Sequence, residues 1–127
     1  LVAVAAQFGG MGFFAFLFPP LVFRYTERED ASKFLRQVFP VYYRVNAGLA
    51  IVPALLLAPG QSYVVELVTM LSVAATFLFS ARFIVPAANR AREAGNDGKF
   101  KAVHRFSVFL HMAQWIAVTV ILLRLAQ

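Results

Sequence analysis

Cysteine is absent from this chain of 127 residues, which excludes disulfide bonds, thiolate metal sites and cysteine nucleophiles. Acidic residues are scarce, with six Asp and Glu against twelve Lys and Arg, and only two histidines are present. The sequence also lacks zinc-type spacings, a nucleophile elbow and a phosphate-binding glycine loop. No complete catalytic set is therefore present, and we expect a protein without enzymatic activity that holds no metal ion in a dedicated site.

Hydrophobic residues, by contrast, make up 61% of the chain, against about 45–50% in soluble domains. A soluble domain of this length could not bury so much apolar surface. Four apolar runs, at about residues 1–23, 41–58, 62–85 and 100–125, are of the length that a membrane-spanning helix needs, about 17–25 residues. The sequence therefore predicts a single all-α domain over residues 1–127, an integral membrane four-helix bundle.

Two charged segments, residues 24–37 and 87–99, separate these spans. In both of these loops we expect short interfacial helices that lie along the membrane surface. Proline has no N–H and should end or kink a helix wherever it occurs. It stands at three of the span boundaries: Pro19 with Pro20, Pro40, and Pro86.

The distribution of charge predicts the orientation. Basic residues gather in and beside the two charged segments, which lie on the same side of a four-span protein. The turn at residues 58–62 lies on the opposite side and carries no charge. Arg124 is the only basic residue on that side. The positive-inside rule places both basic loops in the cytoplasm and both termini outside. We expect the bacterial inner membrane as the location.

The last span carries a polar stripe at positions i, i+3, i+7 and i+10: His104, Ser107, His111 and Gln114. This spacing puts all four side chains on one helix face, which should meet protein or water and not lipid. The stripe has two readings: hydrogen-bonding groups that hold helices together, or a haem ligand or proton relay. The two histidines share one helix, so a haem bound by either would need its second ligand from elsewhere.

Charged residues within the spans fall at two depths. Arg44, Arg82 and Arg105 lie near the cytoplasmic face and could form a cationic cluster, which would either reach lipid head groups or bind an anionic group. Glu66 lies near the outer face, about 24 Å of helix away from Arg82. We therefore expect Glu66 to be a lone outer carboxylate.

Small residues in the first span indicate close helix packing. Ala5 and Gly9 are four positions apart, as are Ala6 and Gly10, and Gly12 follows. Such small-xxx-small pairs let two helix backbones approach each other in a membrane. We assign a helix-packing role to Ala5, Gly9, Gly10 and Gly12.

Four short motifs follow one another along the chain: PLVF at residues 20–23, FPVYY at 39–43, PAAN at 86–89 and FKAVHRFS at 100–107. In this order the chain resembles the transmembrane protein 205-like family of small membrane proteins, a domain of unknown function numbered 4149. The resemblance implies four spans and leaves the activity unassigned.

These features favour a small scaffold or accessory subunit of a larger membrane complex. Its expected partners are membrane lipids and either other membrane subunits or further copies of itself, and not nucleic acid. One alternative is a redox protein that binds haem or another tetrapyrrole through His104 or His111, although the sequence requires no cofactor. The other is an oligomeric transporter or proton-coupled channel lined by the polar stripe.

Overall fold

The computed structural model describes residues 1–127 as helices joined by short connections. The chain forms four rods. The first is α1 (Val2–Phe16) with α2 (Phe18–Tyr25), and the second is α3 (Arg28–Leu57). The third joins the 3₁₀ turn η1 (Gln61–Tyr63), α4 (Val64–Phe79), the π-helical turn η2 (Ser80–Ile84) and α5 (Val85–Glu93), and the fourth is α6 (Asp97–Leu125). All four rods are long and apolar enough to cross a membrane, which confirms the predicted all-α four-helix membrane bundle.

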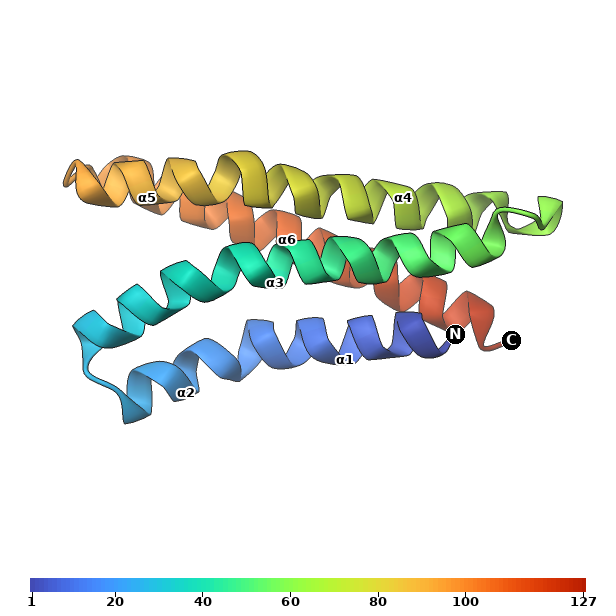
Figure 1. Ribbon diagram of the computed structural model, residues 1–127, viewed down its shortest axis with the longest axis horizontal. Helices are drawn as coiled ribbons and strands as arrows, with labels where there is room; N and C mark the ends of the chain where they lie inside the picture. The colour runs from blue at the N-terminus through green and yellow to red at the C-terminus, as the bar shows by residue number, and fades with distance from the viewer.

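The rods run side by side, and the connections between them lie at the two ends of the bundle (Figure 1). The α2–α3 and α5–α6 connections lie together at one end, which we call the basic end because it carries the charged segments 24–37 and 87–99. Both termini and the α3–α4 turn lie at the other, which we call the turn end.

The first rod bends where the sequence predicts it. Leu17 lies between α1 and α2 with φ −113° and ψ −44°, and Pro19 and Pro20 occupy the first turn of α2. A first helical turn tolerates proline because its N–H groups have no partner within the helix. The prolines therefore change the direction of the rod without ending it.

The prediction of separate interfacial helices in the two charged segments is wrong. Most of the first segment forms the opening turns of α3, and the helix continues through Pro40. Pro40 removes one backbone hydrogen bond and bends the helix, but Ala31 and Leu35 are buried before it and hold those turns in the bundle. Figure 1 shows this bend in the first half of α3.

The second charged segment is divided between α5 and the start of α6. Pro86 does not end its span, because the π-helical turn η2 immediately precedes it and Pro86 falls in the first turn of α5. A π-helical turn shifts the hydrogen-bond pattern by one residue, and the missing N–H of a proline costs little in a first turn. The helix therefore runs on to Glu93.

The main core lies in one half of the bundle. Its twelve residues all come from the midpoints of the rods or from the part nearer the turn end: Val4, Met11, Tyr43, Ala47, Ala50, Ala54, Met70, Val73, Ala74, Phe77, Val118 and Ile121. Alanines at every third or fourth position of α3 let α4 approach closely. The half nearer the basic end has no comparable packed centre.

Candidate functional site

A cavity of about 580 Å³ occupies the half of the bundle nearer the basic end. All four rods line it, and most of its lining is hydrophobic; the aromatic residues are Phe14, Phe16, Phe23, Phe39, Tyr42, Tyr43 and Phe100. This volume is in the range of about 300–1,000 Å³ that is usual for small-molecule sites. We call it the inner cavity.

The cavity exists because α2 points away from the bundle after the bend in the first rod. After the bend at Leu17, α2 has no buried residue, and Figure 1 shows it diverging from α6 toward the basic end. Pro19, Pro20 and Phe23 of α2 line the cavity on this side. The inner cavity is therefore a consequence of the two prolines, which direct α2 away from the bundle axis.

The polar stripe of α6 runs from the surface into the bundle, because His104 is exposed whereas Gln114 is buried. His104, Ser107 and His111 line the inner cavity, and Gln114 is buried beyond it. The Ser107 hydroxyl donates to the backbone oxygen of His104 at 2.8 Å, so no hydrogen bond joins these two side chains. The stripe supplies polar groups to a cavity that is otherwise apolar, and its chemical role stays a prediction.

His111 makes the main polar contact across the cavity. The Tyr42 hydroxyl lies 3.2 Å from His111 Nε2, while His111 Nδ1 is buried without a hydrogen-bond partner. The ring of Tyr42 stacks on Phe14 with 3.7 Å between centroids, which fixes the hydroxyl in place. One ring nitrogen of His111 is thus engaged by Tyr42, and the other is buried without a hydrogen-bond partner.

Beyond the cavity, buried amide side chains continue the polar line toward the turn end. Gln7 donates to the backbone oxygen of Asn46 at 3.0 Å, and Gln114 donates to the Thr76 hydroxyl at 2.9 Å. The side-chain oxygens of Gln7 and Gln114 have no partner. Sequence reasoning gave Gln7 no role, although a lone polar residue in an apolar span is itself a signal of an interior position.

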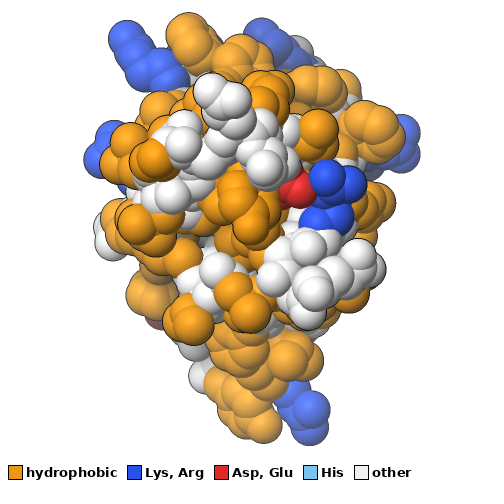
Figure 2. Space-filling model, turned by 90° about the vertical axis from the view of Figure 1, so that its right-hand side faces the viewer, with side chains coloured by type: hydrophobic (Ala, Val, Ile, Leu, Met, Phe, Trp, Pro, Cys, Tyr) orange, Lys and Arg blue, Asp and Glu red, His pale blue; other side chains and the backbone are white.

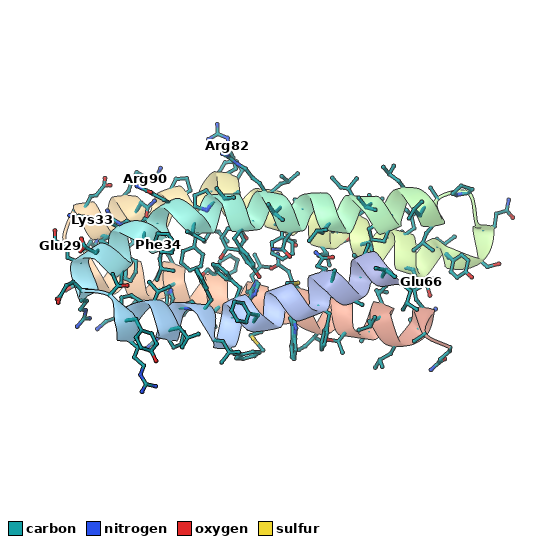
Figure 3. The ribbon with its side chains drawn as sticks, turned by 60° about the horizontal axis from the view of Figure 1, so that its bottom comes forward. Glu29, Lys33, Phe34, Glu66, Arg82 and Arg90 are labelled. Atoms are coloured by element: carbon teal, nitrogen blue, oxygen red, sulfur yellow. The ribbon has the colours of Figure 1, made fainter.

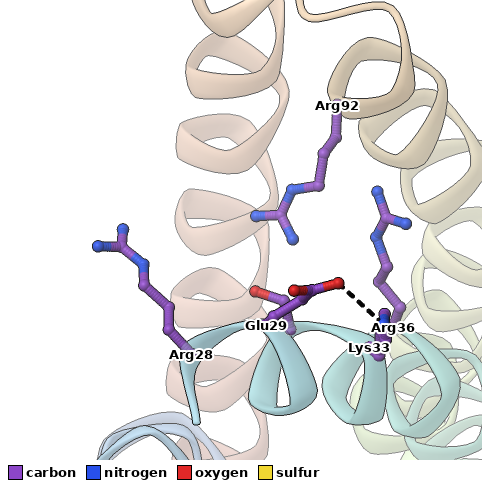
Figure 4. Close-up of a pocket in the computed structure, with 6 residues that line it drawn as sticks. Arg28, Glu29, Lys33, Arg36 and Arg92 are labelled. Atoms are coloured by element: carbon purple, nitrogen blue, oxygen red, sulfur yellow. Dashed lines mark ion pairs between the residues drawn. The ribbon is translucent and has the colours of Figure 1, made fainter.

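A second hollow, of about 610 Å³, opens at the basic end (Figure 4). Its lining contains no hydrophobic side chain and consists of Arg28, Glu29, Ser32, Lys33, Arg36 and Arg92. We call it the basic pocket. Ser32, Arg36 and Arg92 also line the inner cavity, so the two hollows adjoin.

The sequence contained a signal for this pocket that the interpretation missed. Arg28, Ser32 and Arg36 are spaced by four residues, which places them on one face of a helix. Because residues 24–37 were interpreted as a separate surface helix, their arginines were assigned only to the general charge of a loop. Their continuity with α3 is what brings them to the bundle.

The predicted cationic cluster contributes to neither hollow. Arg44, Arg82 and Arg105 are all exposed, and none of them lines the inner cavity or the basic pocket. Figure 3 shows Arg82 pointing away from the bundle, with its guanidinium 5.7 Å from the centre of the Phe83 ring. No ion pair or side-chain hydrogen bond joins the three arginines.

Glu66 is not the lone carboxylate that was predicted. Arg124 Nε lies 2.6 Å from Glu66 Oε1, and the Glu66 side chain is 5% exposed while that of Arg124 is 50% exposed. Glu66 lies near the turn end (Figure 3), whose surface is otherwise mostly apolar or uncharged (Figure 2). The start of α4 and the end of α6 reach the same level there, so the two charges meet.

The small residues of α1 divide into two groups. A Cβ atom on Gly12 would lie 3.5 Å from Nε1 of Trp115, so Gly12 packs inside the bundle. Ala5, Gly9 and Gly10 are exposed, and a Cβ atom on either glycine would meet nothing within 4 Å. These three residues, with Ala6, form an outward face of α1 that no other helix covers.

The inner cavity offers few ligands for iron. The bundle has no group of three or more His, Asp or Glu side chains that could hold a metal ion. His104 stacks on Phe100 with 5.9 Å between ring centroids, and both histidines lie on α6. A haem here could take at most one imidazole from this bundle of four rods.

Comparison with protein families gives one match: the model described as Domain of unknown function (DUF4149) matches residues 2–97. This confirms the family number in the sequence resemblance, whereas the transmembrane protein 205-like name stays a prediction. Comparisons with curated proteins and with solved structures gave no match.

Proposed function

The chain belongs to the DUF4149 family, whose description names no activity, and we propose that it is a non-enzymatic accessory membrane protein that packs through α1 against other membrane helices. The observation that carries this proposal is the outward face of α1. Ala5, Ala6, Gly9 and Gly10 are all exposed there, on a helix whose opposite side is buried through Val4, Gln7 and Met11.

A face of small residues favours a helix as its neighbour. In a membrane, helices associate largely through van der Waals packing, which small residues strengthen by letting backbones approach. Small residues have the same role inside the bundle. Ala47, Ala50 and Ala54 of α3 are buried in the core to which α4 also contributes. Phe13, which is 50% exposed, continues this face one turn further along α1 and would contact a partner helix.

The polar groups of the inner cavity support a role without catalysis. Ser107 donates to its own helix backbone, so this serine is not hydrogen-bonded to a histidine in the manner of a catalytic pair. The hydroxyl of Tyr42 and the ring of His111 are engaged with each other. These groups position side chains and can bind a ligand.

The test uses three glycines with the same surroundings. Gly48 of α3, like Gly9 and Gly10, is exposed and has open space where a Cβ atom would lie. Leucine raises helix propensity at all three positions, so none of the variants should unfold the chain. We expect Gly9→Leu and Gly10→Leu to remove associated subunits in native mass spectrometry of protein extracted from its own membranes, while Gly48→Leu retains them. Unchanged assembly in the α1 variants would reject this interface.

A tetrapyrrole-binding redox function has one observation in its favour, the position of His111 on a cavity of about 580 Å³. Against it, Tyr42 engages one ring nitrogen of His111, and no imidazole faces it from another helix. A visible absorption band in the purified protein that His111→Ala removes would support this alternative. We expect none.

A transport function is favoured by the buried polar side chains of Gln7, Asn46 and Gln114, which lie beyond the inner cavity. Four spans would require an oligomer to enclose a path. The test is flux in liposomes that contain the protein, with His104→Ala as the variant. Permeability that does not depend on His104 would remove this alternative.

A further inference from the structure

The arginines of the basic pocket lack a counter-ion. Glu29 is the only acid in the lining, and its carboxylate pairs with Lys33 at 2.9 Å, as the dashed line in Figure 4 marks. Arg28, Arg36 and Arg92 form no ion pair, and Nε of Arg36 is buried without a hydrogen-bond partner. Three guanidinium groups without an ion pair therefore line a hollow whose one carboxylate, that of Glu29, is already paired with Lys33.

These guanidinium groups lie close enough to affect one another. Arg28, Arg36 and Arg92 line the same pocket, so their like charges repel one another. An arginine stays protonated at any physiological pH, so the repulsion persists. Binding of an anion would relieve it and would give the buried Nε of Arg36 an acceptor.

The adjoining cavity specifies what else the ligand must carry. Arg36 and Arg92 line both hollows, and the guanidinium of Arg92 lies 4.4 Å from the centre of the Phe100 ring, which lines the inner cavity. From Phe100 to His111 the cavity follows about 16 Å of α6 between mostly apolar walls. A ligand that fills both hollows is an anion at one end and hydrocarbon along the rest.

We propose that the basic pocket and the inner cavity together bind a membrane lipid with a phosphate head group. Arg28, Arg36 and Arg92 bind the phosphate, because guanidinium groups match its oxygens in charge and geometry. One hydrocarbon chain passes between the diverging α2 and α6 into the inner cavity. His104, about one turn of α6 beyond Phe100, lies at the level of the ester groups.

A lipid fits this site better than a water-soluble phosphate. The apolar walls extend from the basic end toward the middle of the bundle, a depth that only a ligand already in the membrane reaches without crossing the head groups. Basic pockets between membrane helices are a known means of binding anionic lipid head groups. The site is separate from the outward face of α1, so the proposal does not depend on the proposed function.

The experiment measures lipid retention by native mass spectrometry of the full chain in mild detergent. The probes are phosphatidic acid, phosphatidylglycerol and phosphatidylcholine with identical acyl chains. The phosphomonoester of phosphatidic acid carries nearly two charges at neutral pH, so we expect retention in the order just given. Arg36→Gln and Arg92→Gln should each lower phosphatidic acid retention by about tenfold, the loss of one charge-assisted contact.

Matched controls separate this site from general surface charge. Arg44→Gln and Arg82→Gln remove the same charge from exposed positions outside both hollows and should keep wild-type retention. Glu29→Gln removes the only acid in the pocket and should raise retention. If the control arginines matter as much as Arg36 and Arg92, the lipid is held by surface charge and the proposal fails.

A second variant tests whether the chain enters the cavity. Ser107→Leu places bulk in the inner cavity and leaves the basic pocket unchanged, so it should reduce retention while a thermal melt shows a folded protein. Unchanged retention in this variant would overturn the proposal. Displacement of bound lipid by millimolar inorganic phosphate would also overturn it, because the site would then serve a soluble anion. Gly9→Leu should retain lipid, so failure of the α1 interface is distinguishable.

Discussion

In the half of the bundle nearer the turn end, each buried polar side chain makes at least one contact within the chain, although one oxygen each of Gln7, Glu66 and Gln114 has no partner. Glu66 pairs with Arg124, and Gln114 donates to Thr76. In the half nearer the basic end, Arg28, Arg36 and Arg92 line a hollow and form no ion pair. The same four rods therefore form a packed core in one half of the bundle and enclose a cavity in the other.

The difference has an origin in side-chain size and in proline. Alanines of α3 bring α4 close in the packed half, whereas Pro19 and Pro20 direct α2 outward in the open half. The arginines without an ion pair in the basic pocket are exposed or only partly buried, so the open half keeps them in contact with solvent. The comparison predicts that the same substitution will have different effects in the two halves.

The largest difference is expected for methionine. Met70 of α4 is fully buried in the core, whereas Met112 of α6 lines the inner cavity. Met70→Ala should lower the free energy of unfolding by about 3 kcal/mol, and Met112→Ala by less than half as much, because its neighbours already face open space. Denaturant unfolding in mixed micelles measures both. Equal losses would show that the inner cavity closes in solution.

A smaller effect is expected at the ion pair. Arg124→Met leaves the carboxylate of Glu66 without a partner and should lower the free energy of unfolding, by less than for a fully buried pair because Arg124 is half exposed. Glu66→Gln should cost less, since an amide oxygen can still accept from Arg124. Thermal unfolding in detergent compares the two. A greater loss for Glu66→Gln would contradict this account of the pair.

The smallest effect concerns two hydroxyl groups. Thr76→Val leaves the buried amide of Gln114 without its acceptor and should cost about 1 kcal/mol. Tyr42→Phe removes the hydroxyl that meets His111, but water in the inner cavity can replace it, so its cost should be lower. The same unfolding measurement applies to both variants. A larger loss for Tyr42→Phe would indicate that the cavity excludes water.

Much of this architecture was predictable because it depends on local pattern. The lengths of the apolar runs predict four spans, and the spacing of His104, Ser107 and His111 puts them on one helix face. Pro19 and Pro20 predict the bend in the first rod. Each of these inferences needs only the pitch of a helix and the thickness of a membrane.

Other features depend on which helices become neighbours, and helix pitch does not contain that information. The sequence predicted no partner for Arg124 at the turn end. Arg124 forms an ion pair with Glu66 only because α6 packs beside α4. Pro40 was expected to end a helix, but burial of Leu35 keeps α3 continuous and carries Arg36 to the basic pocket.

The sequence by itself thus determined the number of spans, their apolar and polar faces, and the gathering of positive charge at one end. Tertiary structure alone decided that Glu66 pairs with Arg124, where the bundle is hollow and which arginines border the hollow. The physical reason is that periodicity and hydropathy act within a single helix, whereas ion pairs and cavities depend on how helices from distant parts of the chain pack together.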